Sequence, residues 1–328
     1  MSHRWCRWAQ LGGGAVILGF LVIEVGAAPF LRALPLVTGW PVALAVAITA
    51  LTTACCAWRW SLVAKGLGVD VPFRTALAAY YGSQFLNATL PGGVLGDVHR
   101  GLRHGRAVGD VGRGLRAVAW ERCAGQVVQL GLALVVLLVL PSPVRSFIPV
   151  LTVAVVAGAL GILLLSQARL NRRSSLWATV LRTTANDLRH GVLSRQAWPG
   201  IVVASCLAVV GHALVFLLAA RLGGTDESPM TLLPIAFLVL LASAVPTNIA
   251  GWGPREGVAA WAFHAAGMSA AQGVTTSVVY GVLVIITSLP GLAVLAARGL
   301  RPATSEHEDL LREGRPRSSA RRERVAGG

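Results

Sequence analysis

Long apolar segments alternate with short arginine-rich segments along most of the chain. A helix that crosses a membrane needs about 20 mostly apolar residues. The pattern predicts six such spans, at about Leu11 to Leu31, Trp40 to Trp58, Val118 to Leu140, Phe147 to Leu165, Ile201 to Ala220 and Val274 to Ala297. Two further apolar segments, Phe73 to Leu90 and Met230 to Val245, are less regular. We therefore expect an all-α polytopic membrane protein.

The composition agrees with this class. Hydrophobic residues make up 55% of the chain and charged residues only 13%, and the mean hydropathy is +0.65. These values exclude a disordered chain, a collagen-like repeat, a disulfide-rich scaffold and a coiled coil. The formal net charge of +15 is almost all arginine, since Lys65 is the only lysine. In so apolar a chain, this excess favours anionic lipid head groups over nucleic acid as partners.

The distribution of arginine predicts the sidedness, because positive residues concentrate in cytoplasmic loops. Arg4 and Arg7 place the N-terminus inside, ahead of a first apolar run that is longer than in most signal peptides and is expected to stay uncleaved. Arg59, Lys65 and Arg74 are then cytoplasmic.

A full span at Phe73 to Leu90 would place a cluster of arginines outside, at Arg100, Arg103, Arg106, Arg113 and Arg116. We therefore predict a re-entrant hairpin over about 73–107. The last span must end in the cytoplasm, because Arg298 follows it, and must therefore begin outside. The segment before it then enters and leaves by the outer face, which predicts a second hairpin over about 230–268. The resulting topology is six spans and two oppositely inserted hairpins that form an inverted repeat within residues 1–300, with both termini in the cytoplasm of a cell-membrane protein.

Each predicted hairpin carries a break rich in proline and glycine, followed by charged residues. The first break contains Asn87, Pro91, Gly92, Gly93, Gly96, Asp97 and Arg100, and the second contains Pro246, Asn248, Gly251, Gly253, Arg255 and Glu256. Broken backbone at membrane depth is tolerated only inside protein or beside a wet cavity. A half-helix that begins at such a break directs its positive end at the cavity, so an anion is the expected occupant.

The charged residues at the breaks leave several roles open. Asp97 and Arg100 are three residues apart and share a helix face, so they form either a structural pair or part of a site, and Arg103 continues that face. Arg255 and Glu256 point about 100° apart on a helix, which favours separate partners.

Polar residues inside the predicted spans are further candidates. Glu121 could pair with Arg100 or Arg255, whereas Arg122 either snorkels from the helix end or joins the site. Glu24 is either a protonated structural residue or part of a polar or proton relay. For His212 we favour a packed polar residue over a proton relay.

The remaining segments carry little chemistry. Residues between Arg169 and Arg195 are expected to form an amphipathic helix on anionic lipid, and the tail 301–328 is expected to be disordered in the cytoplasm. The cysteines lack metal-ligand spacing, and no nucleotide-binding, metalloprotease or hydrolase motif is present in the sequence. We therefore expect a protein without cofactor or metal that is not an enzyme.

Three short elements resemble a known family. They are Leu90-Pro91-Gly92-Gly93 with Gly96, Asp97 and Arg100; Glu121-Arg122 with Gly125; and Pro246 with Gly251 and Gly253-Pro254-Arg255-Glu256. In this order the chain is similar, from about Leu51 to Ala297, to the flippase-like transmembrane domain of bacterial lysylphosphatidylglycerol synthases, which also occurs as stand-alone membrane proteins. In that family a small or hydrophobic residue commonly precedes the glutamate, whereas here Pro254-Arg255 does.

The resemblance implies that the protein moves an anionic or modified lipid between leaflets, without the aminoacyl-transferring activity of the synthases. Arg100, Arg103 and Arg255 would bind the lipid phosphate, while Asp97, Glu121 and Glu256 would position the arginines and exchange protons. Some relatives are connected with polyprenyl-phosphate sugars, which keeps an isoprenoid phospholipid in view as a substrate. A membrane enzyme, or the partner of a separate synthase or glycosyltransferase, in polyprenyl-phosphate sugar metabolism is one alternative. A non-transporting scaffold for envelope assembly is the other.

Overall fold

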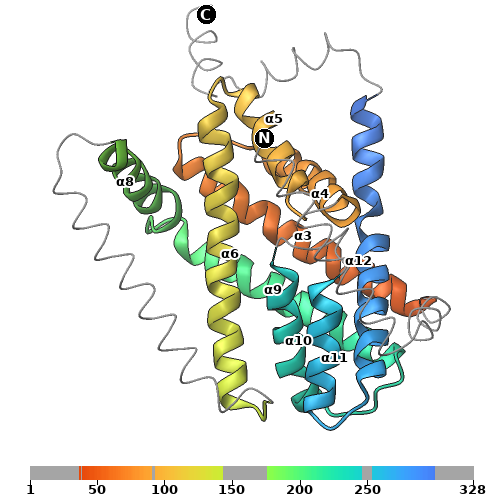
Figure 1. The fold of residues 1–328 in the computed structure, drawn as a ribbon. Helices are drawn as coiled ribbons and strands as arrows, with labels where there is room; N and C mark the ends of the chain where they lie inside the picture. The colour runs from red at the N-terminus through yellow and green to blue at the C-terminus, as the bar shows by residue number, and fades with distance from the viewer. Residues whose placement is uncertain (1–36, 38, 91–92, 143–175, 246–252, 300–328) are drawn as a thin grey trace, which may run out of the picture.

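The described part of the chain contains helices and no strand. In this computed structural model it comprises residues 37, 39–90, 93–142, 176–245 and 253–299. The helices are α3 (Trp40–Gly66), α4 (Phe73–Thr89), α5 (Leu95–Ala107), α6 (Val111–Val139), α8 (Leu176–Asp187), α9 (Trp198–Leu222), α10 (Pro229–Ser243), α11 (Pro254–Ala265) and α12 (Ala270–Gly299), with a short π-helix, η2 (Leu188–Val192) (Figure 1). The predicted all-α class is therefore confirmed.

Four helices, α3, α6, α9 and α12, are long and apolar enough to cross a membrane. They coincide with four of the six predicted spans and extend beyond most of the predicted ends. The other two predicted spans, about 11–31 and 147–165, lie outside the described residues, as do Glu24 and the tail 301–328. The predicted end of one span was wrong: α3 does not stop at Trp58 but continues to Gly66. Arg59 is consequently buried within a helix rather than exposed in a loop.

The two predicted hairpins are pairs of short helices, α4 with α5 and α10 with α11. At 1.5 Å per residue these helices are roughly 18 to 26 Å long, which is less than the ~30 Å of bilayer hydrocarbon. Each break follows from proline: α4 ends before Pro91, α10 ends before Pro246, and α11 begins with Pro254 in its first turn. Figure 1 shows the two hairpins toward opposite ends of α6.

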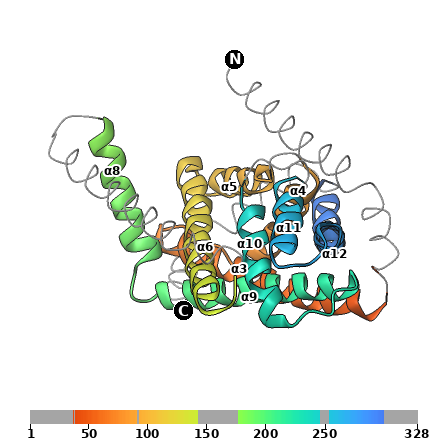
Figure 2. The same ribbon diagram turned by 60° about the horizontal axis from the view of Figure 1, so that its bottom comes forward.

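The long helices hold both hairpins in place. Figure 2 shows α3 and α9 together on one side of the bundle, with the four hairpin helices on the other. Helix α12 packs against both α4 and α11. Glycines permit this close approach, because a Cβ added at Gly291 would overlap the Tyr81 carbonyl oxygen and one at Gly273 would overlap that of Ala259. The main apolar core includes Phe216, Ile235 and other side chains of α9 to α12.

The helix predicted between Arg169 and Arg195 is α8, which lies beside the bundle. The buried Asp187 at its end joins it to α6: Arg116 Nε donates to Asp187 Oδ2 at 2.8 Å, and Trp120 Nε1 donates to the same oxygen at 3.3 Å. Its position on anionic lipid stays a prediction.

Candidate functional site

A fully buried carboxylate, Glu121 on α6, is the centre of a charged cluster. Its Oε1 accepts hydrogen bonds from Arg59 Nε at 2.9 Å and from Arg59 Nη2 at 2.5 Å, while Oε2 accepts one from Arg100 Nη2 at 3.0 Å. The Tyr80 hydroxyl donates to Oε1 at 3.3 Å. A buried carboxylate is tolerable only with such partners. Of the two partners predicted for Glu121, Arg100 is therefore correct, and the second partner is Arg59 rather than Arg255.

Asp97 on α5 extends this cluster. Its Oδ1 accepts hydrogen bonds from Arg100 Nη2 at 3.0 Å and from Ser83 Oγ at 2.9 Å. Its Oδ2 accepts one from Asn87 Nδ2 at 3.0 Å and also pairs with the guanidinium of Arg122. Asp97 and Arg100 therefore do form the pair that their spacing allows. Arg122 does not simply snorkel to the interface, because it binds a carboxylate inside the bundle.

The Arg100 guanidinium lies between two aromatic rings. Its central carbon is 4.4 Å from the centroid of a Trp60 ring and 4.3 Å from that of Tyr80, and its side chain is fully buried. Aromatic faces on both sides stabilise a buried cation. This enclosure makes Arg100 a structural member of the cluster that holds Asp97 and Glu121 together.

The cluster is not electrically neutral. Three guanidinium groups, those of Arg59, Arg100 and Arg122, share the two carboxylates of Asp97 and Glu121, so one positive charge remains. Charges are weakly screened away from water, so this excess attracts an anion.

A second cluster lies at the start of α11. Arg255 donates from Nε and Nη2 to Glu256 Oε1 at 2.9 and 2.7 Å, and Ser277 Oγ on α12 lies 3.0 Å from Arg255 Nε and 3.1 Å from Glu256 Oε1. The prediction of separate partners for Arg255 and Glu256 was wrong. The Glu256 side chain folds back to accept a hydrogen bond from Gly253 N at 2.6 Å, which brings its carboxylate within reach of the flexible arginine.

Protein side chains cap both half-helices. Gly96 N donates to Asn87 Oδ1 at 2.8 Å at the start of α5, as Gly253 N donates to Glu256 at the start of α11. These two N–H groups were expected to face the anion. Because they are already bonded within the protein, the positive charge available to a ligand comes mainly from arginine side chains.

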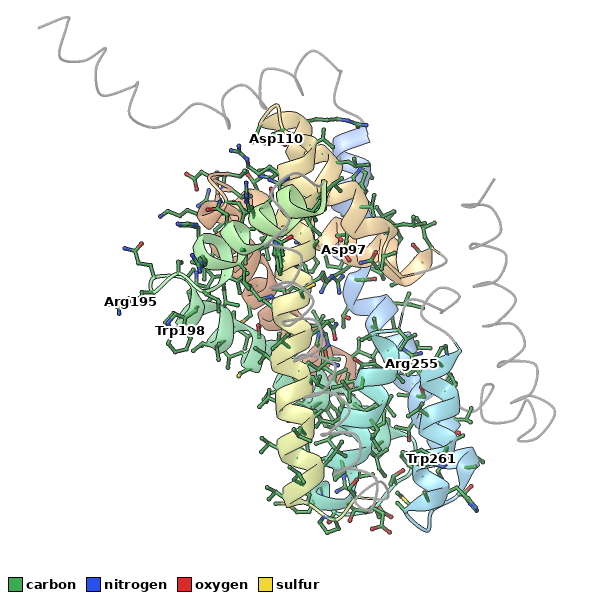
Figure 3. The ribbon with its side chains drawn as sticks, turned by 60° about the vertical axis from the view of Figure 1, so that its left-hand side comes forward. Asp97, Asp110, Arg195, Trp198, Arg255 and Trp261 are labelled. Atoms are coloured by element: carbon green, nitrogen blue, oxygen red, sulfur yellow. The ribbon has the colours of Figure 1, made fainter. Side chains whose placement is uncertain are left out.

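A cavity of about 290 Å³ lies between the two clusters. Its wall includes the guanidinium-bearing residues Arg59, Arg122 and Arg255, and no Asp or Glu among the described residues lines it. Asn87, Ala88 and Gly93 from the first hairpin tip and Ser243, Ala244 and Arg255 from the second also line it. Figure 3 shows Asp97 and Arg255, one from each hairpin, on the same side of α6. Residues that flank the two breaks, although far apart in the chain, thus line one cavity.

The predicted site residues fall into groups around this cavity. Asn87, Gly93, Arg122, His212 and Arg255 line it. Five other predicted residues do not line the cavity but bond to residues near it. Gly96, Asp97, Glu121 and Glu256 each bond directly to a wall residue, and Gly253 bonds to Glu256, which holds the wall residue Arg255. Arg100 is enclosed by Trp60 and Tyr80, and Arg103, one turn farther along α5, does not line the cavity. Pro91, Gly92, Asn248 and Gly251 lie outside the described residues.

Several wall residues, chiefly Arg59, Gln126 and Gln129, were not predicted from the sequence. A signal for the two glutamines was available, since they stand four and seven residues after Arg122 and so share its helix face. The sequence indicates the position of Arg59 more weakly. Apolar residues such as Val63 and Ala64 continue beyond it, which allows the helix to extend past Arg59 but does not show what Arg59 contacts.

Comparison with known proteins identifies the family of the chain. Residues 7–291 match the sequence profile of a family described as "Lysylphosphatidylglycerol synthase TM region". No curated protein and no solved structure matches significantly. The match spans most of the chain and, with four apolar helices of spanning length, identifies a multi-pass membrane protein.

Proposed function

The chain belongs to the lysylphosphatidylglycerol synthase TM region family, and from this premise we propose that its cavity binds the phosphate of an anionic membrane lipid while the lipid moves between leaflets. The observation that carries the proposal is the wall of the cavity. Arg59, Arg122 and Arg255 reach it from three different helices, and no described carboxylate lines it. Guanidinium groups bind phosphate through paired, charge-assisted hydrogen bonds, so three of them around one cavity suit a phosphate.

The carboxylates in this proposal act on the arginines rather than on the lipid. Asp97 holds Arg122, Glu121 holds Arg59, and Glu256 holds Arg255. Fixing each guanidinium in this way lowers the entropy lost when a ligand binds. The first cluster carries a net positive charge, which supports anion binding. Each arginine nevertheless keeps a carboxylate partner, so the bound lipid can still be released.

The proposal includes a membrane topology. The hairpins α4–α5 and α10–α11 enter the membrane from opposite faces, and their tips meet at the cavity near the bilayer midplane. Short broken helices that meet around a substrate are typical of transporters with inverted repeats. The arginine-rich start of α6 supports a cytoplasmic position for both ends of the α4–α5 hairpin, and the proposal puts both termini on that side as well.

This arrangement favours lipid binding over catalysis on polyprenyl-phosphate sugars. Such an enzyme would need a carboxylate that faces the substrate. Asp97, Glu121 and Glu256, in contrast, are buried and held by arginines.

The test is lipid movement in reconstituted vesicles. Purified wild-type protein, Arg255→Gln and the control Arg221→Gln are compared with fluorescent phosphatidylglycerol and phosphatidylcholine, using dithionite to quench the outer leaflet. Arg221 is exposed, bonds to its own loop at Thr225 and does not line the cavity. We expect wild type and control to move phosphatidylglycerol, and Arg255→Gln to lose at least about tenfold in rate, equivalent to about 1.4 kcal/mol.

Equal rates for wild type and Arg255→Gln would refute the role of this cavity. Mass spectrometry of lipids that co-purify with the three proteins provides the second readout. One anionic or isoprenoid phospholipid should be enriched with wild type and control and depleted from Arg255→Gln. A lipid profile equal to that of the bulk membrane in all three would contradict the binding proposal and favour a scaffold.

A further inference from the structure

We propose that Gln126 and Gln129 form a subsite for an uncharged, hydroxyl-bearing head group attached to the bound phosphate. The inference rests on the function proposed above and names its substrate class. It concerns a phosphodiester that carries a polyol, in contrast to a bare phosphate or an amine-bearing head group.

The subsite is one stripe along α6. Arg122, Gln126 and Gln129 are four and three residues apart, which places them on one helix face, and all three line the cavity. The stripe extends for roughly 10 Å along the helix axis. A ligand whose phosphate lies at Arg122 would therefore meet the two carboxamides next.

These carboxamides are available to a ligand. Within the part of the chain that the structure describes, neither Gln126 nor Gln129 makes a hydrogen bond, although both lie half-buried in the second half of α6, which is otherwise apolar. A carboxamide offers both donors and an acceptor, as does a hydroxyl. Polar side chains without a hydrogen bond, on the part of a membrane-spanning helix that lines a cavity, point to a ligand.

The other polar side chains on the wall are largely committed. Asn87 bonds to Asp97 and to Gly96 N. The hydroxyls of Ser243, Thr287 and Ser288 each donate to a carbonyl of their own helix. Gln84 accepts a hydrogen bond from Thr53, so among the described carboxamides on the wall Gln126 and Gln129 are the two without a hydrogen bond.

The charge of the described wall disfavours the amine-bearing alternative. An aminoacyl or ethanolamine head group needs a carboxylate, and none of the described residues on the wall supplies one. It would instead meet the guanidinium groups of Arg59, Arg122 and Arg255. The volume of about 290 Å³ also suits a small head group, with the acyl chains left outside.

The experiment measures lipid preference by native mass spectrometry of wild-type protein, Gln126→Met/Gln129→Met and the control Val127→Leu. Val127 is 70% exposed on another face of α6. The probes are phosphatidylglycerol, phosphatidic acid, lysylphosphatidylglycerol and phosphatidylcholine, and the soluble head group glycerophosphoglycerol is offered in a separate arm. The two single methionine variants replace the double variant if it is not monodisperse.

We expect wild type and Val127→Leu to bind phosphatidylglycerol at least about tenfold more tightly than phosphatidic acid or lysylphosphatidylglycerol. The double variant should lose this preference and keep its affinity for phosphatidic acid. Glutamine-dependent binding in either the lipid or the soluble arm supports the subsite, and the tighter arm identifies the source of the ligand.

Two results would overturn the inference while leaving the proposed function intact. One is equal wild-type affinity for phosphatidylglycerol and phosphatidic acid, or tighter binding of lysylphosphatidylglycerol. The other is an unchanged preference in the double variant. Binding of every anionic lipid at the level of phosphatidylcholine would instead refute the proposed function, and with it this inference.

Discussion

Arg59 and Glu121 join α3 to α6 through two hydrogen bonds to a single carboxylate oxygen, at 2.9 and 2.5 Å. Their side chains are 7% and 0% exposed, so the pair is shielded from bulk water. A Cβ added at Gly125, one turn after Glu121, would press on the Arg59 guanidinium, so the glycine makes room for the pair. The pair is therefore part of the packing between the two helices as well as of the charged cluster.

Replacing Glu121 by leucine should destabilise the protein strongly, because Arg59 and Arg100 would lose a shared buried partner. Removing one member of a buried ion pair typically costs about 3–5 kcal/mol. The measurement is thermal unfolding of the detergent-solubilised protein. The control is Arg113→Gln, which breaks an ion pair with Asp110 whose side chains are 43% and 41% exposed and should cost at most about 1 kcal/mol. Similar losses in both variants would show that burial does not set the strength of the Glu121 cluster.

The helices of this protein could be predicted because membrane helices follow from local rules. Four spans and both hairpins follow from the length of apolar runs and from prolines such as Pro91 and Pro254. The end of α3 could not be predicted, since a buried Arg59 looks like a loop residue until its partner on α6 is known.

The site itself could be predicted only in part. Charged residues at the breaks led to Asp97, Glu121 and Arg255, but the pairing among them depends on how side chains fold back. Glu256 meets Arg255 only because Gly253 N anchors it, and that bond forms only once α11 exists. Gln126 and Gln129 were not predicted as wall residues because a neutral carboxamide costs less to bury in a span than a charge does, so its presence alone does not indicate a site.

Asp97→Asn should weaken lipid binding while the fold is retained. The asparagine still accepts hydrogen bonds from Ser83, but it no longer neutralises Arg100 or holds Arg122 in place. A less ordered Arg122 loses more entropy on binding, so we expect phosphatidylglycerol affinity to fall roughly tenfold, about 1.4 kcal/mol. Native mass spectrometry measures the affinity, and Asp97→Glu serves as the charge-preserving control. Unchanged affinity in Asp97→Asn would contradict the positioning role of Asp97.

Gly281→Ala tests whether the position of Arg255 matters for binding. A Cβ at Gly281 on α12 would overlap Arg255 Nη2, which is the flexible end of a side chain. The arginine should move and the helix should not, so lipid affinity falls about tenfold with little change in thermal stability. Gly131→Ala on α6, where an added Cβ meets nothing within 4 Å, is the matched control and should bind like wild type. If Gly281→Ala lowered the thermal stability but left the lipid affinity unchanged, the substitution would act on helix packing and not on binding.

Cysteine labelling in oriented membrane vesicles tests the two hairpins. The proposed topology places both ends of α4–α5 on the cytoplasmic side and both ends of α10–α11 on the opposite side. Single cysteines at Phe73, Arg106, Met230 and Ser269, all exposed positions, are introduced into a chain whose native cysteines are replaced by alanine. A membrane-impermeant maleimide should label the first two only from the cytoplasmic face and the last two only from the other. Because a hairpin returns to the face it entered, labelling of positions 73 and 106 from opposite faces would mean that this segment crosses the membrane. The prediction of six full spans, which rests on the cytoplasmic location of the arginine-rich loops, would then be wrong.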